Sequence, residues 1–428
     1  MYPVELDERL AYKIGRAFVA FLKCDSVVVG RDMRGSSPSL FKALTDGITD
    51  QGADVVDIGL VTTPMLSFSV ANFNYSGGIM ISASHNPAQY NAFKLIRPKG
   101  VQMHSDSIDQ IRGLVEKGSF DDARKGSINQ KDVLKDYLDH VKGFAEGIRD
   151  LKIVFDYGNG MGALTARPLF DSLPVEAIHM YPEMDMSFPN HPANPHEIGN
   201  FRDLQKRVVM EKADCGIFFD GDADRCQFVD EKGELVFPDM LLALLASDEL
   251  KHHQGEKVYY DLRFSKAVEE DVRKDGGIPI KMRVGNPFYK EKLVNEGGIL
   301  AGEFSGHVMF RDNFCIDDGL FCSVKALAIL AKSGRRLSEL IAPIDRYAHT
   351  EEINMVVDDA DMVLSRVKSA FSDGRSSDID GVYIEYDDWW FSLRKSNTEP
   401  LVRLRIEADN KVILEEKRSM IIGIIEGK

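Results

Sequence analysis

The chain has 428 residues, of which 44% are hydrophobic and 28% are charged, and its formal net charge at pH 7 is −15. This composition, without an apolar stretch near ~18 residues, indicates a globular protein and excludes a membrane span and a disordered tail. The acidic balance, without a run of Lys and Arg, argues against a nucleic-acid partner but permits a small anion in a locally basic cleft.

The length predicts about three or four domains, at the usual ~100–200 residues each. Met1 leads almost directly into a helical pattern, so no secretory or transit signal is expected. Five cysteines are scattered along the chain and form no CxxC pair. Because such cysteines fit a reducing compartment better than a disulfide framework, we expect a cytoplasmic protein.

The first domain is expected at residues 1–148, where helices alternate with short strands. Apolar residues between 10 and 21 recur at helical spacing, and a strand is predicted at 26–29. A helix at 40–51 and a strand at 55–58 continue the alternation, which is typical of an α/β domain.

Three further units follow the first. An α/β unit at 149–253 opens with the strand KIVFD, and another at 254–345 opens with KVYYD. Residues 346–428 differ, because three strand-like runs lie between two helical stretches, which predicts a smaller α+β domain. The three α/β units are of similar size and could reflect a triplication, although no strict sequence period is present.

The first chemical motif is SASHNP at residues 82–87, which follows the apolar run GIMI. A serine hydroxyl is a poor nucleophile unless a neighbour activates it or it already carries the group to be transferred. Here His85 and Lys94 supply nearby basic or cationic groups for Ser84.

The second motif is FFDGDADR, in which Asp220, Asp222 and Asp224 alternate through a loop. Three carboxylates at this spacing can direct hard oxygen ligands to one cation and leave room for a phosphate oxygen and water, which favours magnesium. An EF-hand also begins DxDxD, and Glu231 falls at its twelfth position. However, Arg225 stands where that loop needs glycine, and the flanks resemble strands.

Zinc is not expected at this loop. Cys215 and Cys226 flank the aspartates but do not form a tetrahedral set of nitrogen and sulfur ligands. A glycine-rich turn, GNGMG at residues 158–162, invites a nucleotide-binding interpretation. Because it lacks the full GxGxxG pattern and a Walker lysine, a structural tight turn is favoured.

Two more polar loops complete the set. In GEFSGH, Glu303 and Ser305 could bind sugar hydroxyls, and His307 could exchange a proton near neutral pH. In RKSNTEP, a guanidinium, side-chain donors and turn amides could bind a phosphate. The candidates there are Arg394, Ser396, Asn397 and Thr398. Alone, the first loop would fit a structural histidine and the second a polar hairpin turn.

Together, SASHNP, DGDADR, GEFSGH and SNTEP, in this order, resemble the α-D-phosphohexomutases, and most closely their phosphomannomutase/phosphoglucomutase branch. The resemblance covers nearly the whole chain and includes FPNHPANP at residues 188–195. It implies a heart-shaped architecture of four domains, with three similar mixed α/β domains, a TBP-like α+β domain at the C-terminus, and one loop from each domain in a central cleft.

The resemblance also implies a role for each candidate. Ser84 would be the phosphoserine, and one of its phosphate oxygens would bind Mg²⁺ together with Asp220, Asp222 and Asp224. Lys94 and His307 would be the general acid and base, with His85 beside the phosphoserine. The implied substrate contacts are Arg225, Glu303, Ser305, His307, Arg263, Ser265, Arg283, Lys290, Arg394, Ser396, Asn397 and Thr398.

Three departures from the family pattern are visible. Relatives usually begin with a strand that carries an arginine in a segment like YDxRG, whereas this chain starts almost at its first helix. Either the gene start is truncated or Arg31 or Arg34 takes that role. Asn286 stands where histidine is common and Ala92 where glycine is common, which bears on substrate preference.

The expected function is interconversion of hexose 6-phosphate and hexose 1-phosphate, with mannose or glucose as the sugar and a hexose 1,6-bisphosphate as intermediate and activator. Phosphoglucosamine or phosphopentose mutase is the alternative within this class. A serine-dependent metal phosphatase and a non-catalytic sugar-phosphate-binding relative are alternatives of other classes. Small sugar phosphates are the expected partners, and a monomer or homodimer the expected state.

Overall fold

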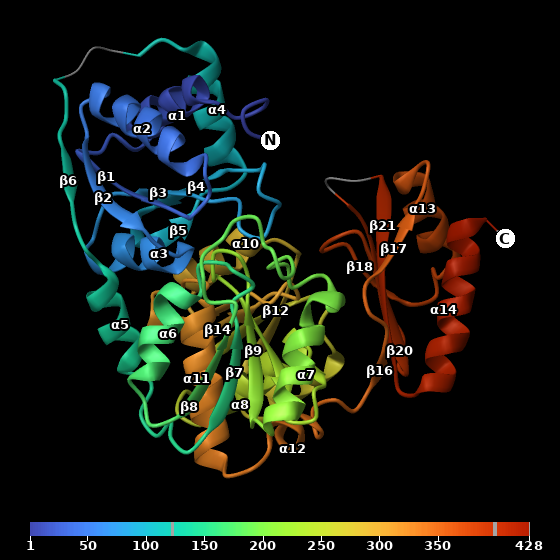
Figure 1. The fold of residues 1–428 in the computed structure, drawn as a ribbon. Coiled ribbons are helices and arrows are strands. Elements are labelled where there is room, and N and C mark those ends of the chain that lie inside the picture. Colours follow the sequence, from blue (N-terminus) through green and yellow to red (C-terminus); the bar gives the residue numbers. More distant parts are fainter. Residues whose placement is uncertain (121–123, 397–399, 428) are drawn as a thin grey trace.

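The computed structural model describes residues 1–120, 124–396 and 400–427, and it contains four β-sheets that follow one another along the chain (Figure 1). The first domain lies against the second and third, whereas the last domain, drawn in orange to red, stands at one side. The predicted fold class, three mixed α/β domains followed by a smaller α+β domain, is confirmed.

The first sheet has the strand order β5-β4-β3-β1-β2-β6. Its strands are β1 (Ser26–Arg31), β2 (Asp54–Leu60), β3 (Gly78–Ile81), β4 (Phe93–Arg97), β5 (Val101–Gln102) and β6 (Ile128–Gln130). Its helices are α1 (Glu8–Leu22), α2 (Ser37–Asp50), α3 (Thr63–Asn72), α4 (Asp106–Lys117) and α5 (Leu134–Lys142). The central strand β1 is a run of buried valines, as a strand covered on both faces requires.

The second sheet has the order β11-β10-β9-β7-β8. Its strands are β7 (Lys152–Asp156), β8 (Glu176–Met180), β9 (Cys215–Phe219), β10 (Cys226–Asp230) and β11 (Leu235–Val236), and its helices are α6 (Ala163–Asp171) and α7 (Arg202–Glu211). The aspartate motif connects the antiparallel strands β9 and β10. Because strands flank this loop, it is not an EF-hand, whose calcium loop lies between helices.

The third sheet has the order β13-β12-β14-β15. Its strands are β12 (Lys257–Asp261), β13 (Ile278–Met282), β14 (Leu300–Gly302) and β15 (Val308–Phe310). The surrounding helices are α8 (Pro238–Leu250), α9 (Lys266–Lys274), α10 (Asn286–Glu296), α11 (Gly319–Ser333) and α12 (Leu337–Ile341).

One arrangement recurs in all three α/β domains. The first strand of each sheet pairs in parallel with the second and third, and the third pairs antiparallel with the fourth. The antiparallel pairs are β3 with β4, β9 with β10 and β14 with β15. The loops between them carry SASHNP, DGDADR and GEFSGH, so each repeat contributes one chemical motif from the same place in its topology.

The last domain is an antiparallel sheet with the order β16-β21-β20-β19-β18, in which β17 also pairs with β21. Its strands are β16 (Ala348–His349), β17 (Ile353–Val356), β18 (Arg375–Ser377), β19 (Val382–Glu385), β20 (Trp389–Lys395) and β21 (Leu401–Ala408). Its helices α13 (Ala360–Ala370) and α14 (Lys411–Glu426) cover one face of the sheet (Figure 1).

Hydrophobic packing divides the molecule unequally. One continuous cluster of buried side chains runs through the first three domains and includes Phe68, Phe155, Phe219 and Phe321. The last domain has a core of its own. Leu262, Tyr383 and Trp390 form a small apolar cluster at its seam with the third domain.

Two further observations concern the whole described chain. All five cysteines are buried and carry free thiols. Among the described residues, no helix combines the length and apolarity that crossing a bilayer requires.

Candidate active site

The loop after β3 is shaped by a buried arginine. Arg34 donates four hydrogen bonds of 2.6–2.9 Å to main-chain carbonyls of this loop, including that of Ser84, and is itself bound to Asp32 (3.1 Å). Ser84 has a positive φ of 52°, which is uncommon for a residue with a side chain, and its amide donates to Ser82 Oγ (3.0 Å). The loop therefore fixes the direction of the Ser84 side chain.

The serine loop and the aspartate loop of the second domain are in direct contact. Ser84 Oγ donates to Asp220 Oδ2 at 2.9 Å. Beneath this bond, a Cβ atom on Gly221 would overlap the carbonyl oxygen of Ser84, so only glycine permits this approach of the two main chains. Gly160 of the GNGMG segment also packs on Gly221, because a Cβ at Gly160 would lie 2.9 Å from the Gly221 oxygen. The GNGMG segment is thus a tight turn that supports the aspartate loop.

Arg225 lies beside the serine hydroxyl. Its guanidinium donates to Asp220 Oδ2 from Nε (3.0 Å) and Nη2 (2.7 Å), and Nη2 is 3.4 Å from Ser84 Oγ. The same nitrogen is 2.6 Å from His85 Nδ1, while Nη1 is 3.2 Å from His196 Nε2. Burial and the charge of Arg225 lower the pKa of His85 to about 4, so this ring is a neutral acceptor. The arginine is therefore oriented toward any phosphoryl group on Ser84.

The three aspartates fit a divalent cation. Each offers an oxygen within 4.8 Å of the others, and all three side chains are buried. Asp222 Oδ1 and Asp224 Oδ1 are buried without a hydrogen-bond partner in the described part of the chain. Burial, only partly offset by Arg225, raises the pKa of Asp220 to about 7. Carboxylates supply the hard oxygen ligands that divalent cations such as Mg²⁺ and Ca²⁺ take, and the crowding of three such groups favours a cation between them.

Lys94 of β4 also reaches this cluster. Its ammonium donates to Asp222 Oδ2 (2.6 Å) and Asp224 Oδ2 (2.7 Å), and the Thr63 hydroxyl at the start of α3 donates to Asp222 as well. Burial would lower the pKa of Lys94, but the two carboxylates outweigh it and raise that pKa. The lysine is therefore protonated and provides a cation next to the serine loop.

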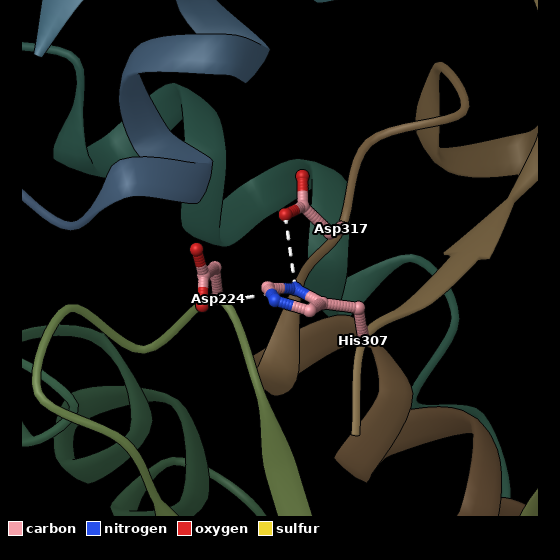
Figure 2. Close-up of side chains that lie close together, drawn as sticks. All are labelled: Asp224, His307 and Asp317. Atoms are coloured by element: carbon pink, nitrogen blue, oxygen red, sulfur yellow. Dashed lines mark ion pairs between the residues drawn. The ribbon is translucent and has the colours of Figure 1, made fainter. Parts of the chain in front are cut away.

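His307 lies between two carboxylates (Figure 2). Its Nδ1 is 3.2 Å from Asp317 Oδ2 and 3.8 Å from Asp224 Oδ1. Burial would lower the pKa of His307, but these charges outweigh it and raise that pKa. Asn286 donates to Asp317 Oδ2 (2.7 Å), and Lys290 lies 4.0 Å from Asp317, with its pKa lowered by burial to about 8.

The remaining residues of the third-domain loops face the same region. Glu303 is buried and accepts from the amide of Gly285 (3.1 Å), and the hydroxyl of Ser305 is buried without a partner among the described residues. Arg263 is held by Asp261 through Nε (2.9 Å) and Nη2 (2.6 Å), and its Nη2 is 4.0 Å from Glu303. An acceptor and a free hydroxyl are thus available for a polar ligand.

Four expected residues lie elsewhere or have another task. Arg283 stacks over Phe288 and lines a separate hollow of about 450 Å³. Ser265 caps α9 by accepting from an amide of its first turn. Arg31 pairs with an aspartate of β2 at 3.0 Å, and Arg34 shapes the serine loop. Any contact of these side chains with substrate stays a prediction.

The loop of the last domain follows β20. Arg394 is directly opposite Arg403 of β21, and each lies 3.4 Å from a carboxylate oxygen of Glu352. The amide of Ser396 donates to the carbonyl of Leu401 (2.9 Å) and closes the hairpin. Asn397 and Thr398 lie outside the described residues. A cavity of about 350 Å³ borders this cluster, and its lining includes His196, Phe304, Glu352 and Arg403.

Several neighbours of the site could not be found from the motifs. Thr63, Asp317 and Glu352 are single polar residues in segments that carry no recognisable pattern, and His196 follows FPNHPANP directly but lies outside it. The one available signal is the pair of acidic residues at 317–318, which follows the GEFSGH loop closely. Their roles depend on contacts between segments far apart in the chain, which only the folded structure reveals.

Comparisons with known proteins agree with this arrangement. Models of the family described as phosphoglucomutase/phosphomannomutase match four successive segments. They are alpha/beta/alpha domain I at residues 2–122, domain II at 135–233, domain III at 237–347 and the C-terminal domain at 352–424.

Named relatives and a solved structure match nearly the whole chain. A phosphoglucomutase of Neisseria gonorrhoeae is 34% identical over 98% of this chain and 94% of its own length. A phosphomannomutase of Salmonella typhimurium is 36% identical over 97% of this chain and 94% of its own. A phosphoglucomutase/phosphomannomutase family protein from Burkholderia thailandensis has a crystal structure with a TM-score of 0.91 and 32% identity, covering 100% of this chain and 95% of that one. The chain therefore belongs to the phosphoglucomutase/phosphomannomutase family.

Proposed function

We propose that the protein is a Mg²⁺-dependent phosphohexomutase that interconverts hexose 6-phosphate and hexose 1-phosphate, with mannose or glucose as the sugar. The observation that carries the proposal is the position of Ser84 Oγ, 2.9 Å from Asp220 and 3.4 Å from Arg225, where loops of two domains meet beside a third. A hydroxyl, a carboxylate trio and a guanidinium in one place are the parts that phosphoryl transfer needs.

In the proposed reaction, phosphorylated Ser84 transfers its phosphoryl group to the free hydroxyl of a hexose monophosphate. The P–O bond to the serine breaks, a P–O bond to the sugar oxygen forms, and the sugar hydroxyl gives up its proton. Arg225 binds the phosphoryl oxygens during transfer. Lys94, protonated in the ligand-free protein, would act as the general acid toward the departing Ser84 oxygen, and His307 in its neutral form would accept the proton of the sugar hydroxyl. Mg²⁺ held by the three aspartates would neutralise negative charge on the phosphoryl oxygens.

The product of this step is a hexose 1,6-bisphosphate, which must turn over before its other phosphate can return to Ser84. Arg394 and Ser396 belong to the loop that would bind the phosphate not undergoing transfer. Glu303 and Ser305 would bind sugar hydroxyls in either orientation. A bisphosphate that stays bound while it turns is protected from loss to solvent.

One assay separates this proposal from its alternatives. Purified protein is incubated with glucose 1-phosphate or mannose 1-phosphate, Mg²⁺ and a trace of hexose 1,6-bisphosphate, and the phosphorus NMR spectrum is followed. Appearance of the 6-phosphate supports a mutase, inorganic phosphate supports a metal phosphatase, and an unchanged spectrum supports a binding protein. Parallel reactions with glucosamine 1-phosphate and ribose 1-phosphate rank the other mutase substrates, and intact mass measures whether Ser84 carries a phosphoryl group.

A further inference from the structure

Two arginines of the last domain face each other across adjacent strands. Arg394 in β20 is in register with Arg403 in β21. Like charges at directly opposite positions of an antiparallel pair destabilise the sheet. An anion at this position relieves the repulsion, and the strand pair is therefore built to receive one.

A carboxylate of the chain itself meets both arginines. Glu352, in the segment between β16 and β17, lies 3.4 Å from Arg394 through Oε1 and 3.4 Å from Arg403 through Oε2. Oε1 is also 3.1 Å from Nη1 of Arg263 in the third domain. Burial would raise the pKa of Glu352, but Arg263 and Arg394 outweigh it and lower that pKa to about 2. The carboxylate is thus ionised near neutral pH.

We propose that Glu352 is an internal occupant of the phosphate clamp: its carboxylate binds the guanidinium groups in the ligand-free protein and yields them to the non-transferring phosphate of the substrate. This inference rests on the proposed function. A carboxylate and a phosphate both accept paired N–H donors from arginine, so they compete for the same groups. The observed free energy of phosphate binding is then the difference between the arginine–phosphate and the arginine–Glu352 interaction free energies.

The surroundings allow Glu352 to withdraw. It borders the cavity of about 350 Å³ that also reaches Arg403 and Phe304, so its side chain has room to turn away from the guanidinium groups. Arg263 keeps both contacts with Asp261 when Glu352 leaves, so no buried charge in the third domain loses its last partner. Phosphate would replace Glu352 at Arg394 and Arg403, and the carboxylate would turn into the cavity, so the exchange leaves none of the three arginines without an anionic partner.

Competition of this kind suits a reaction in which the bound intermediate must turn. A clamp that bound phosphate as tightly as its arginines permit would lower KM and slow the release that reorientation requires. Competition from the Glu352 carboxylate weakens phosphate binding. The same carboxylate pairs with the arginines again as soon as the phosphate leaves. Glu352 is accordingly a positioning residue, which acts on substrate through Arg263, Arg394 and Arg403.

The test replaces Glu352 by its uncharged isostere. Inorganic phosphate is titrated calorimetrically into wild-type protein, E352Q and the control E415Q, whose substituted side chain is exposed on α14 of the same domain and does not line the cavity. E352Q is expected to bind phosphate about three- to tenfold more tightly, whereas E415Q should match wild type. The gain should disappear in E352Q/R394Q, which locates it at the clamp and not at Ser84. In turnover, E352Q should show a lower KM for glucose 1-phosphate together with a lower kcat.

A purely structural role of Glu352 predicts that E352Q does not bind phosphate more tightly than wild type. If Glu352 only fixed the arginines, E352Q would bind phosphate more weakly or equally, and either result overturns the inference. Should E352Q fail to fold, E352D retains the charge but shortens its reach by one methylene, and a gain smaller than that expected for E352Q would support the proposal while a loss would overturn it. Phosphate binding is measured without turnover. Absence of mutase activity in the wild type would therefore refute the proposed function, while the phosphate-binding comparison would still test the role of Glu352.

Discussion

The two ends of the candidate site are built in different ways. On the Ser84 side, loops of different domains touch through their main chains and lie on one hydrophobic core that the first three domains share. On the Arg394 side, the last domain has a separate core and meets the third domain through a small apolar cluster and ionic contacts. Phosphoryl transfer depends on fixed distances, whereas turning of an intermediate depends on release. This contrast suits a rigid Ser84 side, where the proposed chemistry occurs, and a more adjustable Arg394 side, where the other phosphate would bind.

The largest effect is expected at the rigid end. Ser84→Ala removes the proposed phosphoryl carrier and should lower kcat by about a thousandfold or more, because no neighbouring hydroxyl can replace it in the same geometry. The melting temperature should remain close to that of wild type. Ser39→Ala, an exposed serine of the same domain, is the matched control and should retain full turnover. Comparable rates in S84A and S39A would reject Ser84 as the carrier.

Removal of divalent metal ions tests the Ser84 side as well, with an effect on turnover about tenfold smaller. Chelation should lower turnover about a hundredfold and added Mg²⁺ should restore it, since the aspartate trio then neutralises phosphoryl charge again. Mg²⁺ should also raise the melting temperature of wild-type protein but not that of Asp222→Asn.

A second acidic cluster provides the control for the metal. Glu249, His253 and Asp312 also lie close enough together to bind an ion, and Asp312 is exposed. Asp312→Asn should keep both the turnover and the thermal response to Mg²⁺. An equal loss in both variants would move the functional metal away from the Ser84 side.

The adjustable end should respond in binding more than in chemistry. Arg394→Gln removes a charge-assisted contact with phosphate and should raise KM for glucose 1-phosphate about tenfold, while kcat changes less than about threefold. Arg375→Gln, an exposed arginine of the same domain that pairs with Asp387 at 2.8 Å, should leave both constants unchanged. Steady-state kinetics decide the matter, and a fall confined to kcat would contradict the assignment.

The smallest effect is expected at the seam between the third and last domains. The Tyr383 hydroxyl accepts a hydrogen bond from Lys281 across this seam (2.7 Å). Tyr383→Phe should lower the free energy of unfolding by about 1 kcal/mol and leave turnover within about twofold. Tyr386→Phe breaks a bond within the last domain only, to Asp373 at 2.6 Å. Denaturant unfolding of the two variants distinguishes a loss of stability at the seam from one inside the last domain. Only Y383F should also weaken the coupling between unfolding of the last domain and unfolding of the third.

Much of the fold could be anticipated because its signals are local. The buried valines of β1 and the strand pairs that flank each loop are contiguous in sequence, so periodicity and composition predict them. Ser84, Asp220 and Arg225 could likewise be proposed from short local motifs, and the structure brings their side chains together. Contacts that join separate domains carry no such spacing.

The second carboxylate beside His307 illustrates what sequence could not give. Asp317 meets the histidine only because the chain returns after β15 (Figure 2), and nothing local distinguishes it from Asp318, which binds Tyr137 instead. For Arg283 the family resemblance implied a substrate contact, and the structure stacks its side chain on Phe288, so that contact stays a prediction. Tertiary geometry decides such cases, not residue type.

The glycine at position 221 has a consequence for how motion is distributed over a catalytic cycle. Since a Cβ at this position would overlap the Ser84 carbonyl, the main chains of the serine and aspartate loops are already in close contact, and no hinge motion can bring the two loops nearer. In the proposed cycle, both phosphoryl transfers would then use the same fixed contact between the serine and aspartate loops. The movement between the two transfers would come from the sugar and from the last domain, which binds the other phosphate. A protein of this design would tolerate a loose fourth domain far better than a single added methyl group at residue 221.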